Sequence, residues 1–309
     1  MKGRLKMLKK INSGVLLVIL AAFLWSLDGI LRRHLYIIPA PVIIFWEHIF
    51  GSLFLIPLFI PKRKEIKKLR KLDWLSFISI SFFSSVLATI LYTSALAKIH
   101  YIQYSVVVLL QQLQPIFVIT AAAIFLKEKV KPKFIAYALL AIIGAYLVTF
   151  KDLRVNLSTG QGTITAAFLA LGAAFFWGTS TIFSKYVLNK VHHITANSLR
   201  FFLAVPCALG IVFLTKTQSQ LFLLTKIQWL MLLAITLSSG MVAMLIYYQG
   251  LKKIEARVSS ICELFWPVSA LIIGFLYLKE SLTFTQLLGS FMILFGIYRI
   301  AVQKGIKKA

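Results

Sequence analysis

Apolar runs of about 20 residues alternate with short polar segments along almost the whole chain. A helix that spans a bilayer needs about 20 consecutive, mostly apolar residues. The pattern therefore predicts an all-α integral membrane protein with ten transmembrane helices. The expected spans are 13–34, 40–60, 75–97, 104–126, 134–150, 163–185, 195–215, 229–251, 258–278 and 283–301. The segments between these spans are too short to form a separate folded domain.

The composition agrees with this pattern and excludes other classes of protein. Residues of the set AVILMFWYC make up 60% of the 309 residues, charged residues only 14%, and the mean hydropathy is +0.87. A soluble domain of this composition would expose large apolar patches to water. The two cysteines, Cys207 and Cys262, lie inside apolar runs, which excludes a disulfide-rich secreted protein. The run after Lys10 is too long for a signal peptide, so we assign it to the first span.

The distribution of positive charge predicts the orientation in the membrane. The formal net charge is +25, which in a soluble protein would suggest nucleic acid. Here 25 of the 34 Lys and Arg residues fall in both tails and alternate loops, 8 fall in the other loops, and Arg200 lies inside a span. By the positive-inside rule, we expect both termini to be cytoplasmic. We expect the protein to lie in the plasma (inner) membrane. We expect no nucleic-acid partner, and we expect 62–71 to lie on anionic membrane lipid.

The chain resembles itself at an offset of about 152 residues. The clearest stretch aligns 74–99 with 229–254, where nine of 26 positions are identical. The same order of Trp, Pro, Glu and Gly recurs over five consecutive spans, in the pairs Trp25/Trp177, Pro115/Pro267, Glu128/Glu280 and Gly144/Gly296. Shared apolar composition alone would not produce this order. We therefore interpret 1–152 and 153–309 as two copies of one five-helix repeat.

Five spans per repeat fix how the two copies are oriented. Because five is odd, the second copy begins on the opposite membrane face, which makes the repeat inverted. Two halves related by an axis in the membrane plane present equivalent gates to opposite sides, as alternating access requires. We therefore expect two inverted five-helix repeats around a central cavity, and a transport function.

The same residues resemble the EamA-type family of the drug/metabolite transporter superfamily over nearly the whole chain. The motifs that carry the resemblance are Trp25, Trp177, the segment 278–289 and Gly296. The resemblance implies ten helices with cytoplasmic ends, a cavity between the halves and transport of small metabolites, often outward. The chain departs from the family pattern at Glu47, where such proteins often carry Arg, and at Tyr137, which replaces a glycine.

Polar residues within the predicted spans form two sets, one below each membrane surface. An ionisable residue at bilayer depth is costly and usually faces a cavity or a partner. With a rise of 1.5 Å per residue, the set near the outer surface is Asp28, Glu47, Tyr92 and Gln111, and its repeat mates near the inner surface are Ser180, Arg200, Tyr247 and Glu263. We expect these two polar layers to bind substrate or couple its movement, together with Trp25, Trp177 and Gln249.

Structural roles compete with transport roles for the charged members of these layers. Asp28 and Arg32 are spaced i, i+4 with the acid first, which also favours a local ion pair. Glu47 has no basic residue at helical spacing. Its side chain can therefore line the cavity, pair with Arg32 of another segment, or extend to the membrane surface. Arg200 lies at a depth from which it can reach Glu263. The two residues could form a salt bridge that closes the inner side of the cavity, or they could contact the substrate directly.

Two prolines, Pro115 and Pro267, lie about ten residues into equivalent spans. Proline removes one helical hydrogen bond and kinks the helix, which frees a carbonyl that a cavity can use. The pair recurs in register beside Gln114 and Trp266. This recurrence favours a hinge or pocket role over kinking for packing alone.

Motifs of other functional classes do not occur in the sequence. No glycine-rich loop carries a Walker lysine, which argues against ATP-driven pumping. No His/Cys cluster has zinc spacing, and no Gly-x-Ser-x-Gly motif is found. We therefore predict no metal site, no cofactor and no catalytic residues. Small residues around Gly144 and Gly289 indicate close helix packing and leave open whether the protein is a monomer or a dimer.

These features together favour a secondary transporter, an exporter or facilitator, of small polar or amphipathic metabolites. Amino acids are preferred, because both charge signs occur along the predicted pathway. If protons are coupled to transport, Glu47 or Glu263 would carry them. A lipid or lipid-linked sugar flippase of the same fold is one alternative. The other is a membrane enzyme on lipid-linked substrates, which would need its catalytic groups at one interface.

Overall fold

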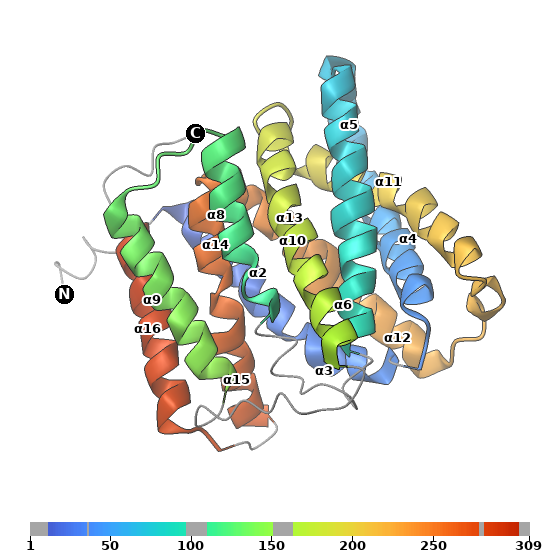
Figure 1. The fold of residues 1–309 in the computed structure, drawn as a ribbon. Helices are drawn as coiled ribbons and strands as arrows, with labels where there is room; N and C mark the ends of the chain where they lie inside the picture. The colour runs from blue at the N-terminus through green and yellow to red at the C-terminus, as the bar shows by residue number, and fades with distance from the viewer. Residues whose placement is uncertain (1–11, 36, 97–109, 151–162, 278–280, 303–309) are drawn as a thin grey trace.

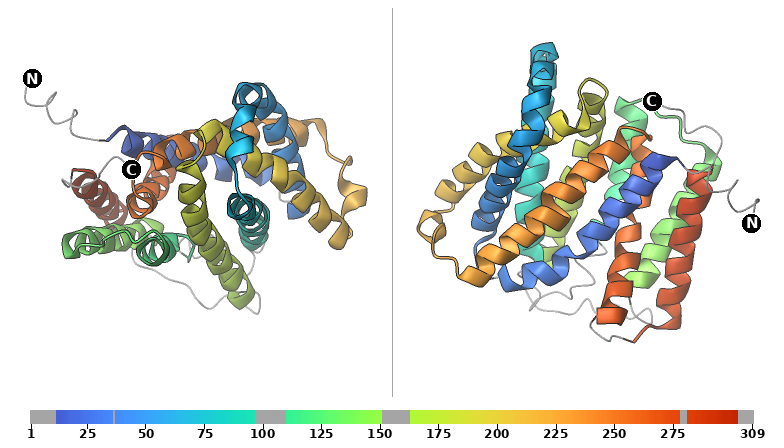
Figure 2. Two further views of the ribbon diagram at one scale, coloured as in Figure 1. Left: turned by 90° about the horizontal axis from the view of Figure 1, so that it is seen from above. Right: turned by 180° about the vertical axis from the view of Figure 1, so that it is seen from behind.

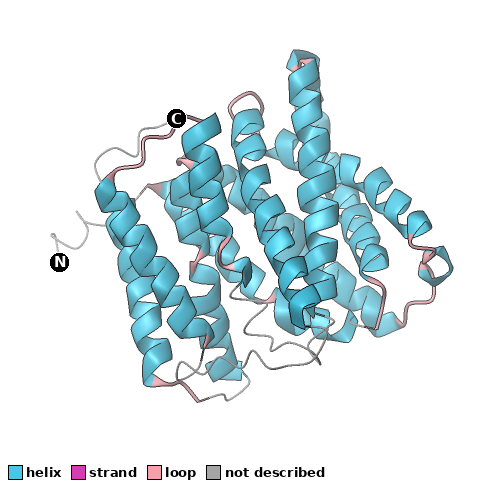
Figure 3. Ribbon diagram, viewed as in Figure 1, coloured by secondary structure: helices cyan, strands magenta, loops and turns pink. Residues whose placement is uncertain are grey.

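The computed structural model describes residues 12–35, 37–96, 110–150, 163–277 and 281–302. All regular elements in these ranges are helices (Figure 3). Nine helical segments in this part of the chain are long and apolar enough to cross a membrane, and they match nine of the predicted spans. A shorter apolar helix, Gln114–Phe125, lies in the predicted fourth span, whose residues 104–109 are outside the described ranges.

The helices of the first half follow the predicted order. They are α2 (Ser13–Ser26) and α3 (Asp28–Arg32), η1 (Arg33–Leu35), α4 (Ala40–Phe59), η2 (Ile60–Lys68), α5 (Lys71–Ser79), η3 (Ile80–Ala88), α6 (Thr89–Leu96), α8 (Gln114–Phe125) and α9 (Pro132–Thr149). Those of the second half are α10 (Thr163–Leu188), α11 (His193–Leu214), η5 (Gln218–Gln220), α12 (Lys226–Ile235), η6 (Thr236–Gly240), α13 (Met241–Leu251), α14 (Ala256–Glu263), α15 (Phe265–Tyr277) and α16 (Phe284–Ala301).

Two kinds of irregularity recur at equivalent positions of the halves. The ninth span is interrupted between α14 and α15, because the ring of Pro267 is incompatible with a helical hydrogen bond to the carbonyl of Glu263 four residues earlier. In the fourth span, α8 begins beside Pro115, four residues after Gln111. The third and eighth spans both contain π-helical segments, η3 and η6. Such segments are frequent at functional sites.

Helix packing between the halves is reciprocal. The α9/α16 pair lies at one side of the molecule and the α4/α11 pair towards the other (Figures 1 and 2). Between these pairs, α2 packs against α13, α14 and α15 of the second half. Correspondingly, α10 packs against η3, α6 and α8 of the first half. The contacts of α2 with α13 and α15 therefore have counterparts in the contacts of α10 with α6 and α8.

The helices α9 and α16 pack closely and run antiparallel. A Cβ atom on Gly144 would lie 2.7 Å from the carbonyl oxygen of Gly289, and one on Gly296 would lie 2.9 Å from that of Tyr137. Later residues of α9 therefore contact earlier residues of α16, which means that the two helices are antiparallel. At the far end, the Gln286 side chain donates to the carbonyl of Val148 at 3.4 Å. Small residues allow this approach of two backbones, as in other membrane helix pairs.

Replacing Gly289 with alanine is expected to destabilise the protein. The added Cβ would lie 2.6 Å from the carbonyl oxygen of Gly144 and 2.7 Å from Cβ of Leu147, so the two backbones must separate. Overpacking of this kind typically costs about 1–3 kcal/mol. Gly210→Ala is the matched control, because nothing lies within 4 Å of its added Cβ. Thermal unfolding in detergent compares the two variants, and equal midpoints would contradict the packing argument.

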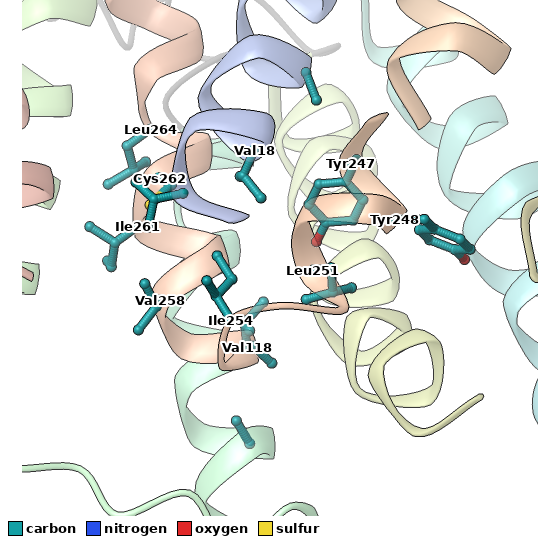
Figure 4. Close-up of a cluster of buried hydrophobic side chains, with 14 of the residues drawn as sticks. Val18, Val118, Tyr247, Tyr248, Leu251, Ile254, Val258, Ile261, Cys262 and Leu264 are labelled. Atoms are coloured by element: carbon teal, nitrogen blue, oxygen red, sulfur yellow. The ribbon is translucent and has the colours of Figure 1, made fainter. Parts of the chain in front are cut away.

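The largest buried apolar cluster contains residues from both halves. It includes Val18 and Val118 of the first half, together with Leu251, Ile261 and Cys262 of the second (Figure 4). All five side chains are fully buried. The two halves therefore share one core, and the cavity described below lies between them.

Candidate functional site

A cavity of about 250 Å³ lies between the two halves. Residues of both halves line it, and they include most of those predicted from the sequence: Trp25, Asp28, Glu47, Tyr92, Gln111, Pro115, Trp177, Ser180, Arg200, Tyr247 and Glu263. Gln249 and Pro267, which were also predicted, are not among its lining residues. Pro267 instead lies just beyond the helix break that ends α14 at Glu263. A metal site is not formed by any group of His, Cys, Asp or Glu in the described part of the chain.

Two aromatic pairs form matching walls of the cavity. The rings of Trp25 and Tyr247 have centroids 5.2 Å apart, and those of Tyr92 and Trp177 are 5.3 Å apart. In each pair, the tryptophan comes from one half and the tyrosine from the other, and the two pairs are repeat mates. The indole nitrogen of Trp177 also donates to the carbonyl of Ser84 in the π-helical segment η3, at 3.1 Å.

One cluster of charges lies where α3, α4 and η6 meet. Arg32 donates from Nε to Oδ2 of Asp28 at 2.6 Å and from Nη2 to Oδ1 at 3.0 Å. Its Nη1 is 2.9 Å from Oε1 of Glu47. The hydroxyl of Ser239, from the other half, donates to Oδ1 of Asp28 at 2.8 Å. The Asp28–Arg32 ion pair, weighed as an alternative to a transport role, is formed. Asp28 and Glu47 also line the cavity, and Glu47 pairs with Arg32.

Arg200 lies in a different environment, among neutral groups. Its Nε donates to the hydroxyl of Ser85 at 2.7 Å and its Nη2 to that of Ser84 at 3.0 Å. Its Nη1 donates to the hydroxyl of Tyr248 at 3.2 Å, and that hydroxyl lies 2.9 Å from the one of Ser184. Arg200 is 7% exposed and lines the cavity. Its charge is not balanced by an ion pair with any carboxylate in the described residues.

The two clusters occupy equivalent positions of the repeat but differ in charge. The corresponding positions are Asp28 and Ser180, Arg32 and Ser184, Glu47 and Arg200, and Ser239 and Ser84. In the first cluster, two carboxylates share one guanidinium. In the second, one guanidinium is surrounded by hydroxyl groups. With the acids ionised, one side of the cavity therefore has a formal excess of negative charge and the other a formal excess of positive charge.

Glu263 is held by neutral donors at the end of α14. The hydroxyls of Tyr247 and Ser259 donate to its Oε1 at 2.8 and 3.1 Å, and the amide of Gln114 donates to its Oε2 at 2.9 Å. The amide of Gln111 donates to Gln114 at 3.2 Å. Gln111, predicted for the outer layer, is thus hydrogen-bonded through Gln114 to Glu263 of the inner layer. The prediction of two separate layers is wrong at this point.

The salt bridge considered between Arg200 and Glu263 is not formed. The hydroxyls around Arg200 come from η3, α13 and α10, whereas the donors to Glu263 come from α8, α13 and its own helix. The two side chains therefore have different partners, although both line the cavity. Neither of them is neutralised by an opposite charge among the residues described.

Sequence reasoning missed the hydroxyl groups that surround the charges. Ser84, Ser85, Ser239 and Tyr248 were not predicted as part of the site. A signal was present for one pair, because Ser84 and Ser239 are an identical pair in the clearest stretch of the internal alignment. Serine and tyrosine are ordinary residues in a membrane helix, however, and only their positions beside Arg200 and Asp28 identify them.

Comparisons with known proteins agree with this architecture. The model of the EamA-like transporter family matches residues 12–150 and 164–302. The chain is 33% identical over 290 residues to the riboflavin transporter ImpX of Fusobacterium nucleatum, covering 93% of this chain and 97% of that protein. It is 26% identical over 184 residues to the uncharacterized transporter YoaV of Bacillus subtilis, covering 60% and 62%. A solved crystal structure superimposes with a TM-score of 0.72 at 15% identity, covering 93% of this chain and 96% of that one.

The matching family model and the names of the relatives point to a membrane transporter rather than an enzyme. The all-helical fold of the described residues and the cavity between the two halves, lined by aromatic and polar residues, agree with this class. The chain belongs to the EamA-like transporter family, whose model matches each half separately. The family and the names of the relatives place this chain among transporters of small molecules.

Proposed function

We propose that the protein is a secondary transporter that moves a small polar or amphipathic metabolite by alternating access, as an exporter or facilitator. The cavity carries this proposal, because equivalent residues of the two halves build it reciprocally. Trp25 pairs with Tyr247 and Trp177 pairs with Tyr92 across the same space. A site shared in this way between two halves can be exposed to either side when the halves rock against each other.

An inverted relation of two five-helix repeats, 1–152 and 153–309, is part of the proposal. It is supported by the contacts of α9 with α16, which are equivalent helices and run antiparallel. The other equivalent pair, α4 and α11, is also antiparallel. Phe59 at the end of α4 touches Phe202 of α11, while Trp46 near the start of α4 donates to the carbonyl of Leu221, which follows the end of α11. The distribution of Lys and Arg supports cytoplasmic termini. The proposed location is the plasma (inner) membrane.

Riboflavin is the first candidate substrate. The support is the 33% identity to a relative named a riboflavin transporter, over nearly the full length of both proteins. The cavity has suitable chemistry, because aromatic rings offer stacking surfaces to a planar ring system. Arg200 and the amides of Gln111 and Gln114 offer donors to carbonyl oxygens, and Glu263 offers an acceptor. Planar rings with polar edges are the ligands that such a mixed lining favours.

Amino acids are the second candidate, favoured by a specific feature of the charges. Arg200 and Glu263 both line the cavity, and each lacks an oppositely charged partner among the residues described. A buried charge without a partner is costly, and a zwitterion would neutralise both. Glu47 and Glu263 are the candidates for a coupled proton.

Transport by the purified protein in liposomes tests the proposal. Vesicles preloaded with unlabelled riboflavin are expected to take up labelled riboflavin by exchange, faster than protein-free vesicles. The same assay with amino acids tests the second candidate. Absence of exchange for every metabolite in a broad panel, by protein that remains folded, would contradict the carrier function.

The remaining alternatives have distinct outcomes in the same vesicles. A flippase would expose fluorescent lipid of the inner leaflet to an external quencher without moving soluble metabolites. A membrane enzyme would release a soluble product without accumulation inside the vesicles. Either result would replace the proposed function.

A further inference from the structure

A second cavity lies at one end of the α9/α16 pair, away from the cavity between the halves, which is called the transport cavity below. It has a volume of about 330 Å³ and is lined by Lys133, Tyr137, Tyr298, Arg299 and Val302. None of these residues lines the cavity between the halves. Lys133 is the second residue of α9, and Arg299 lies in the last turn of α16. Because the two helices run antiparallel, both cations come to the same end of the pair.

The charges in this cavity are positive and not neutralised. Among the residues that the structure describes, its lining contains two cations and no acidic residue. No ion pair involves Lys133 or Arg299 in the part of the chain that is described. The guanidinium of Arg299 lies over the ring of Tyr137, 5.0 Å from its centroid, and 5.8 Å from that of Phe295. These cation–π contacts hold the cation against the helix surface rather than extended into water.

The surface beside this cavity is apolar. Phe291, Leu294 and Phe295 of α16 lie on the helix face that continues to Tyr298 and Arg299, and they are 65%, 44% and 37% exposed. The α9/α16 pair lies at the edge of the molecule (Figure 1), so these side chains face the bilayer when the helices span it. A positive pocket at the end of an apolar, lipid-facing strip matches a ligand with a negative head and two hydrocarbon chains.

We propose that this cavity binds the anionic headgroup of a membrane phospholipid, with the acyl chains along the exposed apolar face of α16. Lys133 and Arg299 would contact the phosphate, and the tyrosine rings would lie at the level of the headgroups. Basic pockets between transmembrane helices are known to bind such headgroups. Aromatic residues are also common at this depth. The site does not depend on the proposed transport function, because it shares no residue with the transport cavity.

Lipid retention by the purified protein tests this proposal. Wild-type protein in detergent is mixed with phosphatidylglycerol or phosphatidylcholine, and bound lipid is counted by native mass spectrometry. The double variant K133Q/R299Q is compared with K216Q/K226Q, which removes the same charge from two exposed lysines elsewhere. We expect the first variant to bind phosphatidylglycerol roughly thirtyfold more weakly than wild type, and the control to bind it like wild type.

Two further measurements distinguish a lipid site from a folding defect and from a site for soluble anions. K133R/R299K keeps both charges and is expected to retain phosphatidylglycerol. This variant shows that the charge matters for binding, even if the neutral variant K133Q/R299Q is less stable because it loses the stacking of Arg299. Glycerol phosphate and inorganic phosphate test a soluble anion as ligand, through the shift they cause in thermal unfolding. Equal retention by K133Q/R299Q and K216Q/K226Q, or a shift by inorganic phosphate as large as that by phosphatidylglycerol, would overturn the proposal.

Discussion

Arg200→Gln is expected to reduce the transport rate at low substrate concentration by about tenfold to a hundredfold, which corresponds to the 1.5–3 kcal/mol of a hydrogen bond to a charged group. The guanidinium lines the cavity, and its charge is not balanced by an ion pair with any described carboxylate. An acceptor group of the substrate is therefore the natural partner for it. Glutamine keeps a donor but loses the charge and the planar fork.

Folding is expected to survive this substitution. The groups around Arg200 are the hydroxyls of Ser84, Ser85 and Tyr248, which leave no buried charge behind when the guanidinium is removed. Serine hydroxyls in a helix can also donate to carbonyls of the preceding turn. A loss of transport with an unchanged unfolding temperature would therefore identify a functional effect.

Arg200→Lys and Lys226→Gln are the companion variants. Lysine keeps the charge without the planar fork, so an intermediate rate is expected. Lys226→Gln removes one exposed positive charge outside both cavities and is expected to transport like wild type. The measurement is initial uptake of the substrate that the wild type carries, over a range of concentrations. Wild-type kinetics in Arg200→Gln would contradict a substrate contact at this residue.

Arg32→Gln is expected to have the largest effect on stability, about 3–5 kcal/mol, because removing one partner of a buried ion pair leaves charge uncompensated. Arg32 is only 4% exposed and is the shared partner of Asp28 and Glu47. Without it, the two carboxylates repel each other at a site between the halves. The prediction is measured by thermal or denaturant unfolding in detergent.

A second substitution tests the physical reason for this effect. Adding Glu47→Gln to Arg32→Gln removes one of the two uncompensated carboxylates, so the double variant is expected to recover part of the lost stability. The coupling between the two changes is obtained from a double-mutant cycle. Additive effects of the two single variants would mean that the Arg32–Glu47 contact does not contribute to stability.

The sequence predicted the helical spans well, because each span has a strong local signal. A run of apolar residues long enough to cross the bilayer is sufficient to identify a membrane helix. Such runs identified α4 and α11, for example, without any knowledge of their neighbours. A kink caused by Pro267 was also expected from the sequence, and the structure places the interruption after Glu263, four residues before that proline. The π-helical segments were not predicted, because residues 80–88 and 236–240 carry no proline and no special pattern.

The candidate site was predicted in its members but not in its connections. Depth and polarity selected Asp28, Glu47, Arg200 and Glu263, and all four line the cavity. Gln249 was selected by the same reasoning and does not line it. Depth along the membrane can be counted from the sequence, whereas the direction in which a side chain projects depends on how each helix is rotated against its neighbours.

The sequence alone determined that this protein is a helical membrane protein with a duplicated architecture, because hydrophobicity and internal similarity are properties of the chain itself. Only the tertiary structure decided how the charges are partnered. It assigned Arg32 to two acids and Arg200 to hydroxyl groups, although Glu47 and Arg200 occupy equivalent positions. Asp28 lies four residues before Arg32 on the same helix, so the spacing along the chain already favoured that pair. The other partners lie on different helices, and Ser84 and Ser85 are more than a hundred residues from Arg200, so that these contacts depend on packing rather than on spacing.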